Sequence, residues 1–413
     1  MAGIAALLRN NRNYRWLWFG QIVSEVGDHF NTVAVLSLSL HLTGQGAAVG
    51  AVMIARLLPG LLAAPLAGLA LDRMNRRTVM LASDLVRAVL AAALLFAVEY
   101  SSIVLLYLIS GLLFFASPFF TAGRSAVLPS ITTAEELHTA NSVTQTTAWL
   151  TLSAGALIGG FATAGFGYSA AFVINGASFL FSALCVWKLR GPESCFRPAG
   201  KHAEQHPLRD VADGFRYIRR TPLILGVTLG YIGWAGGGGA AQILFTLLGE
   251  QVFRRGPAGM GILWGMAGVG LVIGGFLGLY LGRRLSYGQY IHAVWIGYFL
   301  HGAAYVLFSL GSFIEACIWI TVSRTAMGAN NVQNRTMVLR IVPDALRGRV
   351  LTTMEAVLNA TMLVSLALAS QATLFYDPRT IATVAGVAST FSAVPWAWMA
   401  FTGRLRNPRG ESE

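Results

Sequence analysis

Long apolar runs joined by short polar links make up almost the whole chain. A run of about 20 apolar residues is long enough to cross a bilayer as a helix, and runs of this length follow one another from the first link to the last. The pattern predicts an all-α membrane protein with twelve transmembrane helices. The expected spans are residues 16–41, 47–71, 78–98, 102–126, 139–163, 167–188, 223–247, 257–281, 289–310, 314–337, 351–374 and 380–403.

The largest polar interruption is the segment 190–222, in which three prolines precede an amphipathic stretch over 208–220. Such a segment is expected to be a cytoplasmic linker that ends in a short interfacial helix. It divides the spans six and six. We therefore expect an N-terminal bundle at 1–189, the linker at 190–222, a C-terminal bundle at 223–403 and a cytoplasmic tail at 404–413.

The two halves resemble each other at a constant offset of 211 residues. An even number of spans in each repeat gives both halves the same orientation in the membrane. The arrangement is typical of secondary transporters built from parallel repeats, which hold their substrate near the midplane between the halves. The matching positions are Gly50 with Gly261, Arg73 with Arg284, and Arg124–Leu128 with Arg335–Leu339.

Basic residues crowd the links on one side of the predicted membrane. If the N-terminus is cytoplasmic, 22 of the 30 Lys and Arg residues lie inside, 3 lie outside and the rest lie in or at the ends of spans. Basic links remain in the cytoplasm. We therefore expect a multi-pass protein of the bacterial cytoplasmic (inner) membrane with both termini inside. The basic start of the chain leads directly into a span, which does not resemble a cleavable signal peptide.

Composition supports the membrane assignment and narrows the partners. Of the 413 residues, 55% are hydrophobic and 12% charged, and the mean hydropathy is +0.60, whereas soluble domains carry about 25% charged residues. The net charge of +12 lies in links between spans, so no nucleic-acid partner is expected. The three cysteines lack metal-ligand spacing, and we expect no metal, no cofactor and no catalytic residue. The expected partners are a small-molecule substrate, protons and the bilayer, with the chain a monomer.

The link after the second predicted span carries a recognisable motif. The segment Gly68-Leu-Ala-Leu-Asp72-Arg73-Met-Asn-Arg76-Arg77 resembles the loop signature of the major facilitator superfamily, although Asn75 stands where the family usually has a second glycine. Its counterpart in the second half, 278–284, keeps the glycine and the arginines but lacks the aspartate. The resemblance implies the twelve-helix fold of that superfamily and transport without enzymatic chemistry.

Other stretches resemble one branch of the superfamily. Residues 14–28, 128–141 and 342–349 are similar to the bacterial efflux branch that holds the enterobactin exporter and the macrolide efflux proteins. The stretch from Gly155 to Gly160 resembles a glycine motif associated with exporters, with Ala156 in place of its proline. The resemblance covers nearly the whole chain and favours export, but it does not identify the substrate.

Charged residues inside predicted spans are the candidates for proton coupling. Intramembrane charges usually face the interior of the bundle and are often functional. Glu25 and Asp28 are three residues apart, on one face of the first span. Two carboxylates so close in a dry site do not both ionise easily, so one is expected to hold a proton. Glu355, early in span eleven, is a third candidate. In the alternative interpretation, Asp28 is a structural acceptor, Glu25 pairs with Arg56, and Glu355 pairs with arginines of the cytoplasmic link.

Arginines within the membrane are candidates for substrate binding. Arg56 and Arg324 each require an acidic partner or an anionic ligand. They either line a cavity for an acidic or catecholate-like substrate or form internal salt bridges, and the salt bridge is favoured for Arg56. His301, in span nine, is more typical of a packing residue than of a proton relay. The other cavity candidates are Gln242, Asn331, Trp149, Trp234 and Phe30.

The cytoplasmic ends of the first spans are expected to form a gate. Asp84 and Arg87, three residues apart, are predicted to join Asp72 and Arg124 in a network that locks the gate when the cavity opens outward. In the second half, the run Gly236–Gly239 in span seven replaces the carboxylates of the first span, and it serves either as a flexible joint or for close packing. The predicted gate residues are Gly68, Asp72, Arg73, Arg76, Arg77, Asp84, Arg87 and Arg124.

These features favour one function over three others. The favoured hypothesis is secondary active export of an amphipathic small molecule, such as a drug or a siderophore, by proton antiport and alternating access, as in a multidrug efflux antiporter. Translocation of a lysophospholipid or other lipid, or uniport, is the alternative within transport. A membrane-embedded enzyme would need clustered catalytic groups, and the seven histidines are scattered. A receptor would usually carry a soluble output domain.

Overall fold

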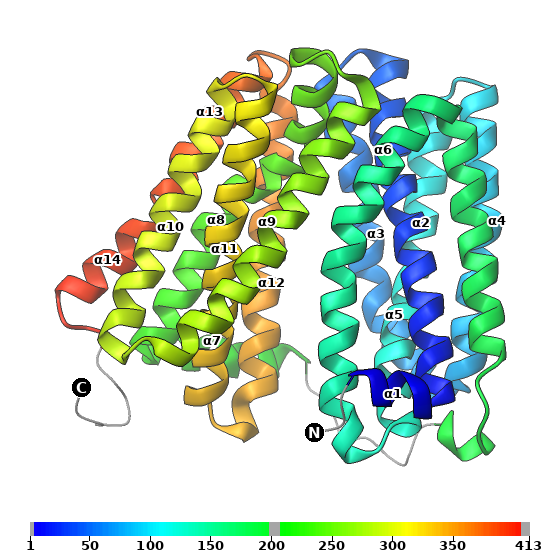
Figure 1. Cartoon of the computed structure of the whole chain (residues 1–413), viewed down its shortest axis with the longest axis horizontal. Coiled ribbons are helices and arrows are strands. Elements are labelled where there is room, and N and C mark those ends of the chain that lie inside the picture. Colours follow the sequence, from blue (N-terminus) through cyan, green and yellow to red (C-terminus); the bar gives the residue numbers. More distant parts are fainter. Residues whose placement is uncertain (1–3, 198–206, 406–413) are drawn as a thin grey trace. The chain divides into compact units, whose positions relative to one another are not determined.

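A computed structural model describes residues 4–197 and 207–405, and regular structure within these ranges is helical (Figure 1). The chain divides into two compact units. One comprises Met1–Lys201 with Gly249–Gly265, and the other comprises His202–Leu248 with Met266–Glu413. The division assigns residues 249–265, which comprise a π-helical turn, a short link and the start of the helix that begins at Gly256, to the first unit, while the domain boundaries expected from the sequence remain predictions.

Nine helical segments of the described ranges are long and apolar enough to cross a membrane. They agree with the predicted spans, and the all-α membrane fold is confirmed. Their helices are α3 (Gly46–Arg73), α4 (Arg76–Glu99), α5 (Ile103–Ile131), α6 (Ala134–Trp187), α8 (Pro222–Leu247) with the π-helical turn Leu248–Val252, α9 (Gly256–Arg284), α10 (Tyr287–Leu310), α12 (Asp344–Ala372), and α13 (Pro378–Thr390) followed by α14 (Ala393–Phe401).

Two further predicted spans form equally long helices of more polar composition. The first is α2 (Arg12–Thr43), which carries Glu25 and Asp28, and the second is α11 (Phe313–Ile341), which carries Arg324 and a run of amides. These polar residues lower the mean hydropathy of both helices. The two helices that fall short on hydropathy therefore carry the intramembrane charges Glu25, Asp28 and Arg324.

Helix α6 contains the remaining pair of predicted spans, 139–163 and 167–188. It runs for 54 residues and is interrupted at Gly167, whose φ of 80° lies in the left-handed region. Glycine adopts this conformation without the steric penalty that a Cβ would bring. The helix therefore turns at Gly167, and its two halves cross the membrane in opposite directions.

The predicted amphipathic stretch forms α7 (Pro207–Arg220). Gly214 lies against α12, where a Cβ would come within 2.2 Å of Thr353 Oγ1. Asp213 pairs with Arg349 of α12 at 3.1 Å, while Val211 and Phe215 are exposed. The short helix is thus attached along one face and open along the other. The preceding part of the predicted linker, 198–206, lies outside the described residues. Two further short segments are α1 (Ile4–Asn10) and the 3-10 turn η1 (Glu193–Cys195).

The helix bounds support the sequence duplication. A shift of 211 positions carries α4 onto the bounds of α10, and it carries α3 and α5 onto α9 and α11 to within a residue. The packing is repeated as well. In the first unit α2 packs along α6, and α4 packs against α5 and α6; in the second unit α8 packs along α12 and α13, and α10 packs against α11 and α13.

Each unit has its own apolar core. In the first unit the core includes Tyr14, Met80 and Phe120. In the second unit it is built around Trp396, which is fully buried and donates its indole N–H to the Ile291 carbonyl oxygen at 2.8 Å. These cores hold the polar side chains described below at defined positions on their helices.

Candidate functional site

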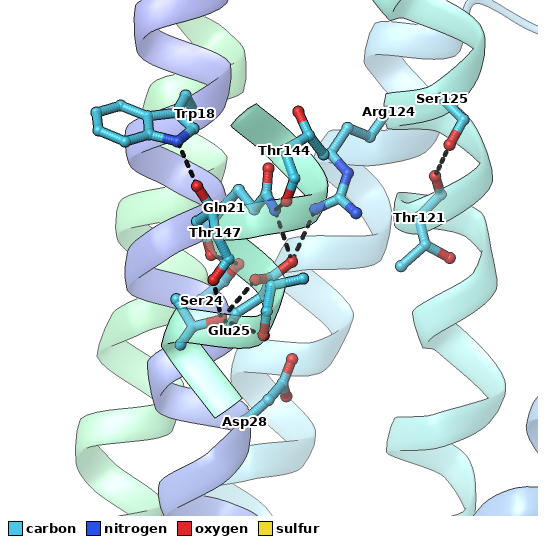
Figure 2. Close-up of polar contacts among 12 residues, drawn as sticks. Trp18, Gln21, Ser24, Glu25, Asp28, Thr121, Arg124, Ser125, Thr144 and Thr147 are labelled. Atoms are coloured by element: carbon cyan, nitrogen blue, oxygen red, sulfur yellow. Dashed lines mark hydrogen bonds and ion pairs between the residues drawn. The ribbon is translucent and has the colours of Figure 1, made fainter. Parts of the chain in front are cut away.

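Glu25 of α2 is the centre of a polar cluster in the first unit. Its Oε1 accepts from Arg124 Nη1 of α5 at 3.0 Å and from Gln21 Nε2 at 2.9 Å, and its Oε2 accepts from Thr151 Oγ1 of α6 at 2.8 Å. Figure 2 shows Arg124 reaching from its helix to Glu25, with Asp28 one turn further along α2. The cluster thus joins three helices through one carboxylate.

This geometry corrects one sequence-based interpretation. The alternative interpretation pairs Glu25 with Arg56, and the predicted gate network joins Arg124 to Asp72, Asp84 and Arg87, but Glu25 and Arg124 are partners of each other. The physical reason is the rotation of α2. Its carboxylate at position 25 faces α5 and α6, whereas the next turn faces α3 and α4. The two carboxylates on one helical stripe therefore have different partners.

Asp28 belongs to a second cluster, with Arg87 and Asp84 of α4. Arg87 is buried, pairs with Asp84 in close contact, and places Nη1 3.9 Å from Asp28 Oδ2. The guanidinium also lies over the rings of Phe120 and Phe179, at 4.8 and 4.3 Å from their centroids. Asp84 is fully buried, while the Asp28 side chain is 31% exposed. The expected Asp84–Arg87 pair is present, and Asp28 is its more accessible neighbour.

Arg56 of α3 lies on the other side of Asp28. Its Nη2 donates to Thr32 Oγ1 at 2.7 Å, and that hydroxyl donates to the Asp28 carbonyl oxygen at 2.8 Å. The guanidinium stacks on Phe114 at 4.3 Å and is close enough to Asp28 to interact electrostatically. Within the described residues, Nε and Nη1 of Arg56 have no hydrogen-bond partner. Asp28 is therefore one carboxylate between two buried arginines.

Glycines bring α2 and α6 close together at the level of Asp28. A Cβ on Gly27 would meet Ser178 Oγ at 2.1 Å, and Cβ atoms on Gly155 and Gly159 would meet His29 and Phe30 at 2.9 Å. The predicted glycine motif of span five thus serves close packing against α2. Phe30 is buried in this contact, which makes it a packing residue of the helix pair, whereas the sequence placed it among the cavity candidates.

The predicted gate link ties α3 and α4 to the ends of other helices in the first unit. Arg76 Nη1 donates to the Ala126 carbonyl oxygen at 2.9 Å, and Arg77 donates to the carbonyl oxygen of Trp187. Asn75, in place of the usual glycine, caps α4 by accepting from the backbone N–H groups of Arg77 and Thr78. Asp72 and Arg73 are exposed, and Gly68 has open space around its Cα.

In the second unit, Arg324 of α11 is buried among aromatic side chains. It is 8% exposed, and its guanidinium carbon lies 5.7 Å from the centroid of the Phe245 ring. His301 of α10 is fixed by Ser323, whose Oγ lies 2.8 Å from Nδ1 and 2.9 Å from the His301 carbonyl oxygen. His301 is therefore a packed residue with satisfied polar atoms, as expected, while Arg324 and its neighbour Tyr305 interact electrostatically with each other.

Glu355 lies in a small pocket of the second unit with Tyr231 and Arg335, lined further by Val338, Leu351, Met354 and Leu358. Arg335 occupies the repeat position of Arg124, so each unit has an arginine near a carboxylate at this level. The alternative interpretation pairs Glu355 with arginines of the cytoplasmic link, but Arg347 and Arg349 of that link have other partners. Arg347 pairs with Asp344 at 2.6 Å, and Arg349 pairs with Asp213 at 3.1 Å.

The glycine run Gly236–Gly239 lies within α8, and the helix continues through it without a break. Cβ atoms on Gly237 and Gly239 would meet Ser389 Oγ at 1.9 Å and the Met362 carbonyl oxygen at 2.3 Å, whereas Gly236 has open space. Close packing therefore accounts for Gly237 and Gly239. The remaining cavity candidates are partly exposed side chains: Gln242, Asn331, Trp149 and Trp234.

Sequence reasoning missed the hydroxyl and amide residues that complete these clusters. Gln21 and Thr151 hold Glu25, Thr32 links Arg56 to Asp28, and Tyr305 lies beside Arg324. Gln21 and Thr32 could have been found from their positions one helical turn from Glu25 and Asp28. Thr151 and Tyr305 lie on other helices from their partners and carried no local signal.

Comparison with known proteins places this architecture in context. The model of the Major Facilitator Superfamily matches residues 17–333. The putative bacilysin exporter BacE of Bacillus subtilis is 24% identical over 350 residues, which cover 83% of this chain and 84% of that protein. The multidrug efflux pump Tap of Mycolicibacterium fortuitum is 29% identical over 213 residues, 50% of this chain and 52% of Tap. The uncharacterized transporter YfiS of B. subtilis is 25% identical, and the match spans about half of its length.

Solved structures share the fold at lower identity. The nucleoside transporter NupG superposes with a TM-score of 0.74 at 13% identity, over 94% of this chain and 98% of NupG. A bacterial homologue of the iron transporter ferroportin, in its inward-facing state, superposes with a TM-score of 0.72 at 15% identity, over 94% of this chain and 98% of the homologue. At these identities the likeness concerns the fold.

Proposed function

Because the chain belongs to the major facilitator superfamily and is a multi-pass membrane transporter rather than an enzyme, we propose that it exports an amphipathic small molecule from the bacterial cytoplasm across the inner membrane, in exchange for protons. The efflux direction draws support from relatives named as an exporter and an efflux pump. A drug or a siderophore remains the expected kind of substrate. The termini are proposed to be cytoplasmic because basic residues crowd those links.

The observation that carries the proton coupling is the position of Asp28. Its side chain is about one-third exposed, within a helix of the membrane domain, and it faces the buried Arg87 at 3.9 Å. Asp84 already binds the same guanidinium in close contact. Arg87 therefore keeps a counter-ion when Asp28 takes up a proton, and Asp28 can change its charge without leaving a bare cation in a dry site.

The protonation of Asp28 would change the contacts between helices. A charged Asp28 attracts Arg87 of α4 and Arg56 of α3 toward α2. A neutral Asp28 loses that attraction and leaves Arg87 to Asp84. In the proposed cycle, proton binding and substrate binding favour different arrangements of these helices, so that each substrate molecule exported is linked to proton entry.

Transport in proteoliposomes tests this proposal. Purified protein is reconstituted and given a pH gradient, and the movement of norfloxacin, ethidium and erythromycin is followed in separate assays. We expect gradient-driven movement of at least one compound by the wild type and its loss in Asp28→Asn. The matched control is Asp377→Asn, which changes an exposed carboxylate at the start of α13. Accumulation by the wild type that does not depend on the pH gradient, or the same loss of accumulation in the control, would contradict the proposal.

A further inference from the structure

A buried cation of the second unit, Arg324, has no carboxylate partner among the described residues. Arg324 lies twelve residues into α11 and is 8% exposed. At about 1.5 Å per residue, this places its Cα roughly 18 Å from the start of the helix, in the middle of a span. Among the described residues, no aspartate or glutamate pairs with its guanidinium, and its ionisable neighbours are the Tyr305 phenol and the His301 imidazole. A charge at this depth requires an acidic partner or an anionic ligand.

The neighbouring polar groups do not supply the missing negative charge. His301 contributes no anion, and Ser323 occupies its Nδ1 at 2.8 Å. Tyr305 is 2% exposed, and its hydroxyl has no hydrogen-bond partner within the described residues. The guanidinium and the phenol hydroxyl are thus hydrogen-bond donors on two neighbouring buried side chains, and each is a suitable donor to an anionic group.

Aromatic rings form the wall beside these donors. Phe245 of α8 lies 5.7 Å from the Arg324 guanidinium carbon and packs edge-on against Phe308 at 5.7 Å between centroids, and Phe308 contacts Tyr305 at 5.1 Å. Rings of this kind bury flat apolar groups well. The surroundings therefore suit a ligand in which a carboxylate is attached to an aromatic or flat apolar body.

We propose that Arg324 and Tyr305 form a carboxylate-binding site, and that the transported molecule carries an anionic carboxylate on an aromatic body. The second part rests on the proposed export function, whereas the first part does not. Arg324 binds the carboxylate through its planar pair of N–H donors, Tyr305 adds a third donor, and Phe245 covers the ring. The ligand neutralises a charge to which the described part of the chain supplies no carboxylate.

Equilibrium binding of radiolabelled benzoate to the purified full-length protein tests the site. We expect saturable binding that benzamide, the neutral counterpart, does not compete for. Arg324→Gln should weaken binding at least about tenfold, which corresponds to the loss of a charge-assisted hydrogen bond. Tyr305→Phe, which keeps the ring, should weaken it severalfold. Arg284→Gln is the matched control, because Arg284 is an exposed arginine of the same unit.

The variants also separate binding from folding. Arg324→Gln removes a buried charge that has no carboxylate partner within residues 4–197 and 207–405, so its melting temperature without ligand should equal or exceed that of the wild type. Benzoate should raise the melting temperature of the wild type and leave that of Arg324→Gln unchanged. Equal benzoate binding by wild type and Arg324→Gln, competition by benzamide, or the same stabilisation by sodium chloride alone would overturn the inference. Saturable benzoate binding without gradient-driven transport would leave the site standing and remove the proposed proton coupling.

Discussion

The Glu25–Arg124 pair makes a quantitative prediction about the stability of the first unit. The two side chains are 20% and 17% exposed and meet at 3.0 Å. Removal of one partner from a buried pair destabilises a protein by about 3–5 kcal/mol, and partial exposure reduces the effect. We expect Arg124→Gln to lower the free energy of unfolding by about 2 kcal/mol, because Glu25 keeps its charge and the donors Gln21 and Thr151 but loses its counter-ion.

The assay uses the buried thiol of Cys185, which is 0% exposed and lies in the same unit. In a background with the other two cysteines replaced by serine, a thiol-reactive dye reports the unfolding of this unit on heating. A change of about 2 kcal/mol lowers the melting temperature by roughly 4–8 °C in a unit of this size. Glu25→Gln should have a similar effect, since it leaves Arg124 without its carboxylate.

The double variant distinguishes a specific pair from two independent sites. With both residues changed to glutamine, no unpaired charge remains, so we expect the double variant to be more stable than the sum of the single losses predicts, by about 1–3 kcal/mol. Neutralisation of the exposed pair Glu193–Arg197, which is 66% and 64% exposed, is the control and should change stability little. Additive losses at Glu25 and Arg124 would refute the reasoning.

Two other predictions concern packing and capping. Gly27→Ala places a Cβ 2.1 Å from Ser178 Oγ and should destabilise the α2–α6 contact by about 1–3 kcal/mol. Gly68 has open space around it, so Gly68→Ala should be neutral or slightly stabilising. Thermal unfolding measures both variants, and equal losses would show that the helices tolerate no substitution of glycine, rather than that Gly27 is needed for packing. Asp377 caps α13 by accepting from Arg379 N and Thr380 N, and its hydrogen bonds with Thr380 lower the pKa of its carboxyl group. The stabilisation by the Asp377 carboxylate should therefore be complete above the ordinary pKa of an aspartate and disappear as the pH falls through the lowered pKa. Asp377→Asn keeps a capping side chain but does not titrate, so it should remove this pH dependence of stability from acid-unfolding curves.

The sequence predicted the fold well because the fold depends on local patterns. Run lengths predicted the helices, and the repeat offset predicted which helices correspond, as α4 and α10 show. The Asp84–Arg87 pair was also predictable, since three residues on one helix face fix its geometry. Gly167 shows the limit of this approach: its link is so short that two spans form one interrupted helix.

The partners of the intramembrane charges could not be predicted. Glu25 and Arg124 are 99 positions apart and meet because of how α2 is rotated against α5, which no local pattern records. The sequence pattern favours Arg56 as the partner of Glu25 because both residues are isolated charges within predicted spans. The structure instead places Arg56 on Thr32, close to Asp28. Pairing between helices depends on packing, and packing follows from many weak contacts together.

The central claim is that Asp28 takes up the proton that drives transport, while a chain with a neutral side chain at this position still exchanges substrate. Counterflow, in which unlabelled compound inside the vesicles exchanges for labelled compound outside without a pH gradient, separates the two. We expect Asp28→Asn to retain counterflow of the compound that the wild type moves and to lose accumulation driven by the pH gradient. Accumulation by Asp28→Asn at the wild-type rate under the same gradient would contradict the account.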